Sequence, residues 1–429
     1  MKRLVSLDIL RGLAIIGVIF THASIFNSDV PASSSQPSLL GNIILYFLTW
    51  AGIFAIISGI GNTIAMYSRV REGTWTPKQV LTNSLIGGMI TLLVNYLYLG
   101  LFSPGFLPPT LPTESFLSAF IRRGIVLIPN PAQLLFATAL MMIAWGTIFS
   151  GICVYFITKK FSGKVSNRAY IVLGIVAIVC ILIYTPLQTV LRPLMVSPLT
   201  WLNFGGALVA SWIVGPMDPM LPYVGFAIFG VIFGLLLVDD AERRRILFFG
   251  YGAGIIITII GFTWVAFVGV IIYDYDTPPL ATLISILGPM LLLVTASIHV
   301  IDLRGDVVKQ GWLKHSTTVR AFGLISLTGF LLEGPFAALV RQIVNLFLSG
   351  FTYNASFSLF FSPLLLILWW IIVRRWAKVH FKYSFEYFII HLTGKLTGKK
   401  TDRLNVDYIL RSDSAYLENI NPLQIASGS

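Results

Sequence analysis

The sequence predicts an all-α protein, a polytopic bundle of about ten helices that span a membrane. Of its 429 residues, 56% are hydrophobic and 11% are charged, whereas soluble domains carry about 25% charged residues. Several stretches run for about 20 residues with almost no charge, which is long enough to cross a hydrocarbon core of about 30 Å. This composition excludes a large water-soluble domain.

Ten apolar stretches, separated by charged, Ser-rich or Pro-rich connections, are expected to span the membrane. In chain order they cover about 4–26, 39–67, 80–102, 134–158, 169–190, 223–238, 246–272, 280–301, 319–348 and 357–373. Two long connections contain weaker helical patterns. Residues 114–127 are amphipathic and are expected to lie at the membrane interface, and residues 201–214 are too short to cross the core.

The distribution of Lys and Arg residues predicts the orientation of these spans in the membrane. The formal net charge is +12, and alternating the connections between the two sides leaves all but four of the Lys and Arg residues on one side. The exceptions are Arg122, Arg123, Arg192 and Arg341. Cytoplasmic connections carry such an excess, so both termini are expected in the cytoplasm, in a plasma-membrane protein. The same bias explains the positive charge without a nucleic-acid partner.

Neither a disulfide nor a metal site is predicted. Cys153 and Cys180 both lie in apolar stretches, where a free cysteine behaves as a small hydrophobe. No spacing of Cys and His residues matches a metal-binding pattern. No metal cofactor is therefore expected.

The first expected span contains three residues that are costly in a membrane, Asp8, Arg11 and His22. Asp8 and Arg11 lie one turn apart, and His22 follows Arg11 on the same face at about 16 Å along the helix axis. Arg binds phosphate or carboxylate bidentately, and His is the usual general base near neutral pH. A structural Asp8–Arg11 ion pair with an interfacial His22 explains the same spacing equally well.

This opening segment resembles a known family. Residues 6–17 read Ser-Leu-Asp-Ile-Leu-Arg-Gly-Leu-Ala-Ile-Ile-Gly, and His22 lies eleven positions after Arg11. The pattern is similar to the first helix of the transmembrane acyltransferase superfamily. That group includes the acyltransferase-three enzymes, the heparan-alpha-glucosaminide N-acetyltransferase family and YeiB-like membrane proteins. Residues 218–225, 277–289 and 323–333 resemble later motifs of the same group.

The resemblance implies transfer of an acyl group, expected to be acetyl, from cytoplasmic acyl-CoA to an acceptor at the outer face. The acceptor class it implies is a cell-envelope sugar or glycolipid. His22 is expected to be the general base, because the first outer connection lacks the histidine used by the glucosaminide branch. Arg11 is expected to bind the donor and Asp8 to orient Arg11. Residues 1–375 are expected to form this domain, and 376–429 a cytoplasmic tail, partly on the membrane surface and partly disordered.

Two further sets of residues are assigned by the same reasoning. Basic residues of the first inner connection are expected to attract the CoA nucleotide, although topology and lipid headgroups explain them too; they are Arg69, Arg71 and Lys78. Polar residues near the outer half are expected to line the acceptor cavity, and they are Asp218, Glu333 and Arg341.

Two other classes of protein fit the intramembrane charges. A proton-coupled transporter would also place Arg, His and Glu inside its helices, but the sequence shows no internal repeat and no matching pair of interrupted helices. A non-catalytic membrane protein of the same fold would tolerate substitution at Arg11 and His22.

Overall fold

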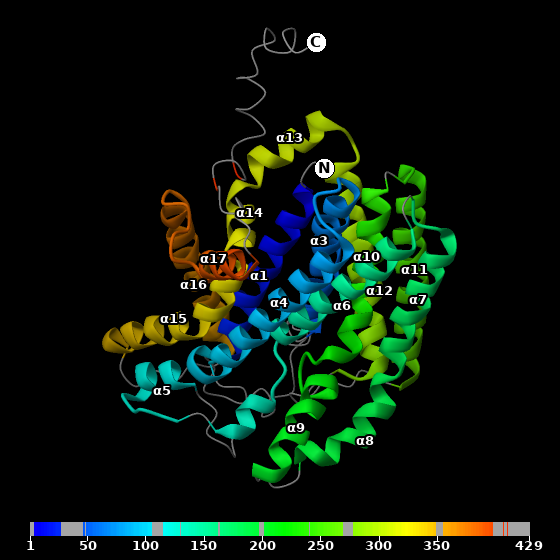
Figure 1. Cartoon of the computed structure of the whole chain (residues 1–429). Coiled ribbons are helices and arrows are strands. Elements are labelled where there is room, and N and C mark those ends of the chain that lie inside the picture. Colours follow the sequence, from blue (N-terminus) through cyan, green and yellow to red (C-terminus); the bar gives the residue numbers. More distant parts are fainter. Residues whose placement is uncertain are drawn as a thin grey trace.

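The computed structural model describes residues 4–26, 46–47, 49–104, 115–128, 130–161, 164–196, 201–239, 241–268, 278–348, 355–397, 406 and 410. Across these residues the regular structure is helical, apart from a single bridge between Ala137 and Met217. The prediction of an all-α bundle is confirmed (Figure 1).

The helices follow one another through the whole chain (Figure 1). Their bounds are α1 Val5–Phe26, η2 Thr49–Ala51, α3 Gly52–Arg71, α4 Pro77–Leu97, η3 Tyr98–Phe102, α5 Phe116–Arg123, η4 Pro131–Leu135, α6 Ala139–Lys160, α7 Asn167–Leu182, α8 Tyr184–Val196, α9 Trp201–Val214, α10 Met220–Val238, α11 Arg243–Val268, α12 Leu280–Ser297, η5 Ile298–Asp302, α13 Asp306–His315, α14 Thr317–Leu324, α15 Ser326–Phe347, α16 Ala355–Ala377 and α17 Phe385–Thr397.

Among the described residues, nine spans are long and apolar enough to cross a membrane. The pair α7 and α8, bent by 42°, gives a tenth, so the expected number of about ten spans is confirmed. The shorter predicted elements are present as well. Helix α5 lies within the amphipathic stretch, and α9 covers the apolar stretch that is too short to span.

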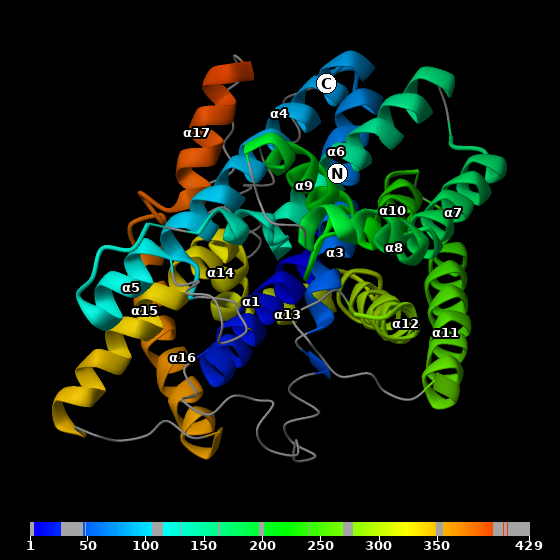
Figure 2. The same cartoon turned by 90° about the horizontal axis from the view of Figure 1, so that it is seen from below.

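Helix α10 lies at the centre of the bundle, against α3, α6 and α7 (Figure 2). Its sequence is apolar on every side, which is typical of a helix surrounded by others. Glycines let its neighbours approach closely. A Cβ at Gly230 would lie 2.3 Å from the carbonyl oxygen of Ile56, and a Cβ at Gly59 would lie 2.2 Å from that of Ala227. Small residues at these positions therefore allow the helices to pack closely.

Helix α1 is anchored at its N-terminus by the end of the α12–η5 span. The Asp302 carboxylate accepts hydrogen bonds from the amides of Val5 at 2.9 Å and Ser6 at 3.1 Å. Lys309 lies 3.7 Å from the same carboxylate. First-turn amides of a helix have no partner within the helix, so this side chain satisfies two of them. The anchor fixes the position of the helix that carries His22.

The expected single span over residues 319–348 is instead two helices, which corrects that prediction. Ile325 has φ −112° and ψ 30°, which interrupts the helix between α14 and α15. A side chain from α17 bonds the first amides of α15, so the second helix starts with its own cap. In Figure 1, α15 extends sideways from the bundle and α17 lies beside it.

Candidate active site

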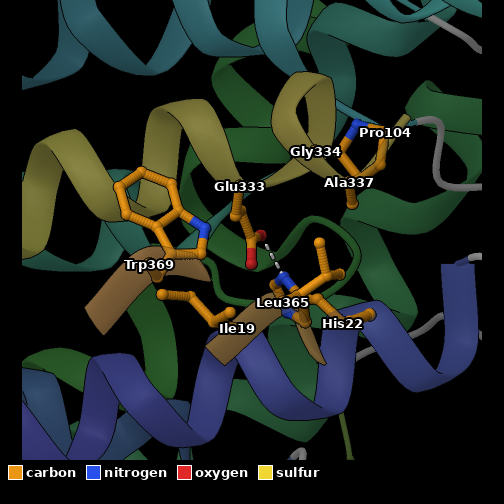
Figure 3. A pocket seen from close by; sticks show the side chains of 9 residues that line it. Ile19, His22, Pro104, Glu333, Gly334, Ala337, Leu365 and Trp369 are labelled. Atoms are coloured by element: carbon orange, nitrogen blue, oxygen red, sulfur yellow. Dashed lines mark hydrogen bonds and ion pairs between the residues drawn. The ribbon is translucent and has the colours of Figure 1, made fainter. Parts of the chain in front are cut away.

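The side chains of His22 in α1 and Glu333 in α15 are joined by a hydrogen bond within the bundle (Figure 3). The atoms joined are Nδ1 of the imidazole and Oε1 of the carboxylate. The His22 side chain is 15% exposed and that of Glu333 is 4% exposed. The ring of Phe330, one turn before Glu333, meets the imidazole edge-on with centroids 6.2 Å apart. A carboxylate in this position orients the imidazole and selects its tautomer.

The pair faces a small pocket whose other walls are almost entirely apolar (Figure 3). Three helices and the segment after η3 contribute its lining, which consists of Ile19, His22, Ala23, Pro104, Glu333, Gly334, Ala337, Leu365 and Trp369. The second carboxylate oxygen of Glu333, Oε2, is buried and has no hydrogen-bond partner among the described residues. Because an unsatisfied buried acceptor is costly, this oxygen is suited to receive a donor from a molecule in the pocket.

Asp218 approaches the same pair from the segment before α10. Burial raises the pKa of Asp218 to about 7, and the Tyr223 hydroxyl and the positive charge of His22 both act to lower it. The segment is held by the bridge to Ala137, whose carbonyl accepts the Asp218 amide at 2.9 Å. Asp218, Glu333 and His22 therefore come together from three distant parts of the sequence.

Arg11 and Asp8 lie elsewhere on α1. Arg11 Nη1 and Asp8 Oδ1 are 4.0 Å apart, and the side chains are 25% and 8% exposed. Arg11 lies against α3, because a Cβ at Gly61 would be 3.8 Å from its Nη2. At 1.5 Å per residue, Arg11 and His22 are separated by about 16 Å along α1. Neither Asp8 nor Arg11 lines the His22 pocket.

The basic residues of the α3–α4 connection have different surroundings. Arg71 Nη1 lies 2.6 Å from Asp239, a buried residue at the end of α10. The Arg69 guanidinium lies over the Trp75 ring, 4.4 Å from its centroid. Lys78 is exposed in the first turn of α4. On α15, Arg341 follows Glu333 by eight residues and is not part of the pocket lining.

Sequence reasoning missed two features of this region. Leu365 and Trp369 of α16 line the pocket, but in the sequence they belong to an apolar span and differ in no way from its lipid-facing residues. Asp239 was placed only in an inner connection. In the sequence Asp239 stands beside Asp240 and close to Glu242, so no signal marked it as the buried one.

Comparison with known proteins identifies the family. The family model described as heparan-alpha-glucosaminide N-acetyltransferase, catalytic, matches residues 3–263. The match covers more than half of the chain and includes Arg11, His22 and Asp218, whereas Glu333 lies beyond it. A comparison with curated proteins gives no match. The chain belongs to the family of the heparan-alpha-glucosaminide N-acetyltransferase catalytic domain, within the transmembrane acyltransferases that its first helix resembles.

Proposed function

We propose that this protein transfers an acetyl group from acetyl-CoA to a hydroxyl or amine, with His22 and Glu333 at the reacting centre. The observation that carries this proposal is the His22–Glu333 pair, which faces a pocket in a chain of a membrane acetyltransferase family. A carboxylate, an imidazole and an adjoining space are the parts that general base catalysis of acyl transfer requires.

In the proposed reaction, Glu333 Oε1 accepts a hydrogen bond from the Nδ1–H of His22, so Nε2 carries no proton and is the basic nitrogen. His22 takes the proton from the acceptor hydroxyl or amine while that oxygen or nitrogen attacks the thioester carbonyl. The new C–O or C–N bond forms as the C–S bond breaks, and the CoA thiolate leaves. The negative charge of Glu333 stabilises the imidazolium that forms.

The surroundings of the pair favour this chemistry. Ile19, Ala337, Leu365 and Trp369 present apolar surface beside it. Interactions between charges are stronger in such low-dielectric surroundings than in water. Glu333 Oε2, buried beside the pocket, is available to hold an N–H or O–H of the acceptor. Asp218, with its raised pKa, supplies a second carboxyl near His22.

The donor is proposed to enter from the other end of α1. Arg11, oriented by Asp8, would bind a phosphate or carbonyl oxygen of acetyl-CoA. Arg69 and Lys78 would attract the nucleotide. Arg71 is already paired with Asp239 at 2.6 Å, so its proposed contribution is electrostatic attraction of the nucleotide at long range rather than direct contact. The proposed acceptor is a sugar or glycolipid of the cell envelope.

Release of free CoA from labelled acetyl-CoA tests the proposal in detergent-purified protein. The His22→Ala variant is compared with His315→Ala, which removes an exposed histidine of α13. We expect wild type and His315→Ala to release CoA and His22→Ala to lose at least 99% of the rate, the usual scale of general base catalysis, about 10²-fold or more. Equal rates in all three proteins would contradict the proposal. Proton-coupled flux in sealed vesicles without CoA would favour a transporter.

The acceptor chemistry is tested in the same assay. Glucosamine offers an amine and hydroxyls, whereas N-acetylglucosamine offers hydroxyls alone. Acceleration of CoA release by both sugars supports O-transfer, and acceleration by glucosamine alone supports N-transfer. The label must appear on the sugar in either case.

A further inference from the structure

Helix α17 is joined to the start of α15 by hydrogen bonds, three of which are made by the side chain of Glu386. Its Oε1 accepts hydrogen bonds from the amides of Leu327 at 2.7 Å and Thr328 at 3.1 Å. Its Oε2 accepts a hydrogen bond from the Thr328 hydroxyl at 2.5 Å. The amide of Phe385 donates in turn to the Thr328 hydroxyl oxygen at 2.8 Å. Four hydrogen bonds thus link two segments that lie 57 to 59 positions apart.

These bonds satisfy groups that the helix itself leaves unpaired. The helical conformation is interrupted at Ile325, so Leu327 and Thr328 lie in the first turn of a new helix. Amides of a first turn have no carbonyl partner within their helix. A carboxylate there also interacts favourably with the partial positive charge of the helix N-terminus. Glu386 therefore acts as the cap of α15, although it comes from another helix.

The neighbouring residue of α17, Phe385, contacts the end of η3, next to the segment that lines the pocket. The Phe385 ring meets the Phe102 ring edge-on, with centroids 5.7 Å apart. The carbonyl oxygen of Phe102 and the ring of Pro104 both lie 3.1 Å from where a Cβ of Gly334 would be. Pro104 and Gly334 line the His22 pocket. Phe385 and Glu386 therefore hold the two segments that meet beside Glu333.

We propose that Glu386 is a positioning residue for acetyl transfer: by capping α15 at the Ile325 break, it holds that helix where Glu333 reaches His22. The inference rests on the proposed function for its catalytic consequence. Glu333 follows Thr328 by five residues, about 7.5 Å along the helix. A helix turns by about 100° per residue, so slippage at its first turn swings Glu333 away from the imidazole.

One face of α17 is exposed and supplies a matched control. Phe388, Leu392 and Leu396 are 54%, 43% and 59% exposed. They form an apolar stripe at helical spacing, which suits contact with the membrane. Leu392→Ala trims this exposed face of the same helix and leaves the Glu386 hydrogen bonds in place.

The kinetic test measures kcat and the KM for acetyl-CoA in the full-length protein. We expect Glu386→Ala to lower kcat at least tenfold with KM within twofold, because the CoA part of the donor is proposed to bind at Arg11 and the α3–α4 connection, away from α15. Glu386→Gln keeps an acceptor oxygen for the two amides and is expected to recover most of the rate. Leu392→Ala is expected to match wild type. A Glu386→Ala rate within twofold of wild type, or a loss in Glu386→Gln equal to that in Glu386→Ala, overturns the proposal.

Hydrogen exchange of backbone amides supplies a readout that does not depend on turnover. In Glu386→Ala, exchange is expected to accelerate over residues 326–338, while α10 keeps its protection. Unchanged exchange over 326–338 overturns the positioning role even if activity falls. If wild type itself shows no acetyl-CoA turnover, the proposed function fails, and this exchange result alone decides the role of Glu386.

A second variant covers the case in which Glu386→Ala does not fold. Thr328→Val removes the hydroxyl that Glu386 Oε2 and the Phe385 amide share, and keeps the size of the side chain. We expect its kcat to fall at least threefold, with exchange accelerated over the same residues. Full activity with wild-type exchange overturns the proposal.

Discussion

Glu333 Oε1 and His22 Nδ1 form a hydrogen bond between residues 311 positions apart in the sequence. The first span and the penultimate span are thereby joined at a polar contact within an otherwise apolar pocket. The family match includes His22 but ends at residue 263. The partner of the proposed catalytic histidine therefore lies in the C-terminal part of the chain, beyond the region by which the family is identified.

Gly59 supports the close packing of α3 on α10, and its replacement is expected to destabilise the protein. A Cβ there would lie 2.2 Å from the Ala227 carbonyl oxygen, so Gly59→Ala forces the helices apart. We expect a loss of about 1–3 kcal/mol, the usual cost of overpacking, measured as a lower midpoint of unfolding in detergent. The control is Gly17→Ala in α1, where nothing lies within 4 Å of the added atom. Equal midpoints for the two variants would show that this contact is not tight.

Asp239 joins α3, α7 and the end of α10. It accepts hydrogen bonds from Arg71 at 2.6 Å and from the Tyr67 hydroxyl at 3.0 Å, and it is 5% exposed. Asp239→Ala leaves these donors without their acceptor, and we expect a loss of about 2–4 kcal/mol. The exposed Glu242, three residues later, supplies the control Glu242→Ala. Chemical denaturation of both variants checks the prediction, which a loss below about 0.5 kcal/mol in Asp239→Ala would contradict.

Asp218 is expected to make the free energy of unfolding depend on pH. Burial raises its pKa from 3.8 to about 7, so the folded state binds a proton more tightly than the unfolded state does. The stabilisation from this group is complete below pH 3.8, declines as the pH rises and is lost above about pH 7. Asp218→Asn is expected to remove that decline. The measurement is the unfolding midpoint of both proteins from pH 4 to pH 8, and parallel curves would refute the prediction.

Most spans were predictable because they are long stretches that are mainly apolar. Helix α10 illustrates this, since its 19 residues contain no charge. The interruption at Ile325 was not predictable, because both sides of it remain apolar and the capping carboxylate comes from Glu386, 58 or 59 positions after the amides that it caps. Hydropathy detects a span but not a cap supplied from another helix.

The sequence singled out His22 and Glu333 as candidate site residues but did not predict that they pair. His22 and Glu333 stood out as ionisable groups inside expected spans, yet the sequence assigned them to separate roles, base and cavity lining. Their contact depends on the packing of α15 against α1, which periodicity alone does not determine. Arg71 illustrates the same limit, since its pairing with Asp239 depends on how α3 and α10 end side by side. The directions of both termini and the boundary at residue 375 stay predictions.

A double-mutant cycle on acetyl-CoA turnover tests the central claim, that His22 and Glu333 act as one catalytic unit. The rates of His22→Ala, Glu333→Gln and the double variant are compared with wild type, with folding checked by the unfolding midpoint of each. Residues that act as a unit are strongly non-additive, so the double variant is predicted to be no slower than His22→Ala. If the two losses multiply, or if Glu333→Gln turns over at the wild-type rate, the pair is not the reacting centre.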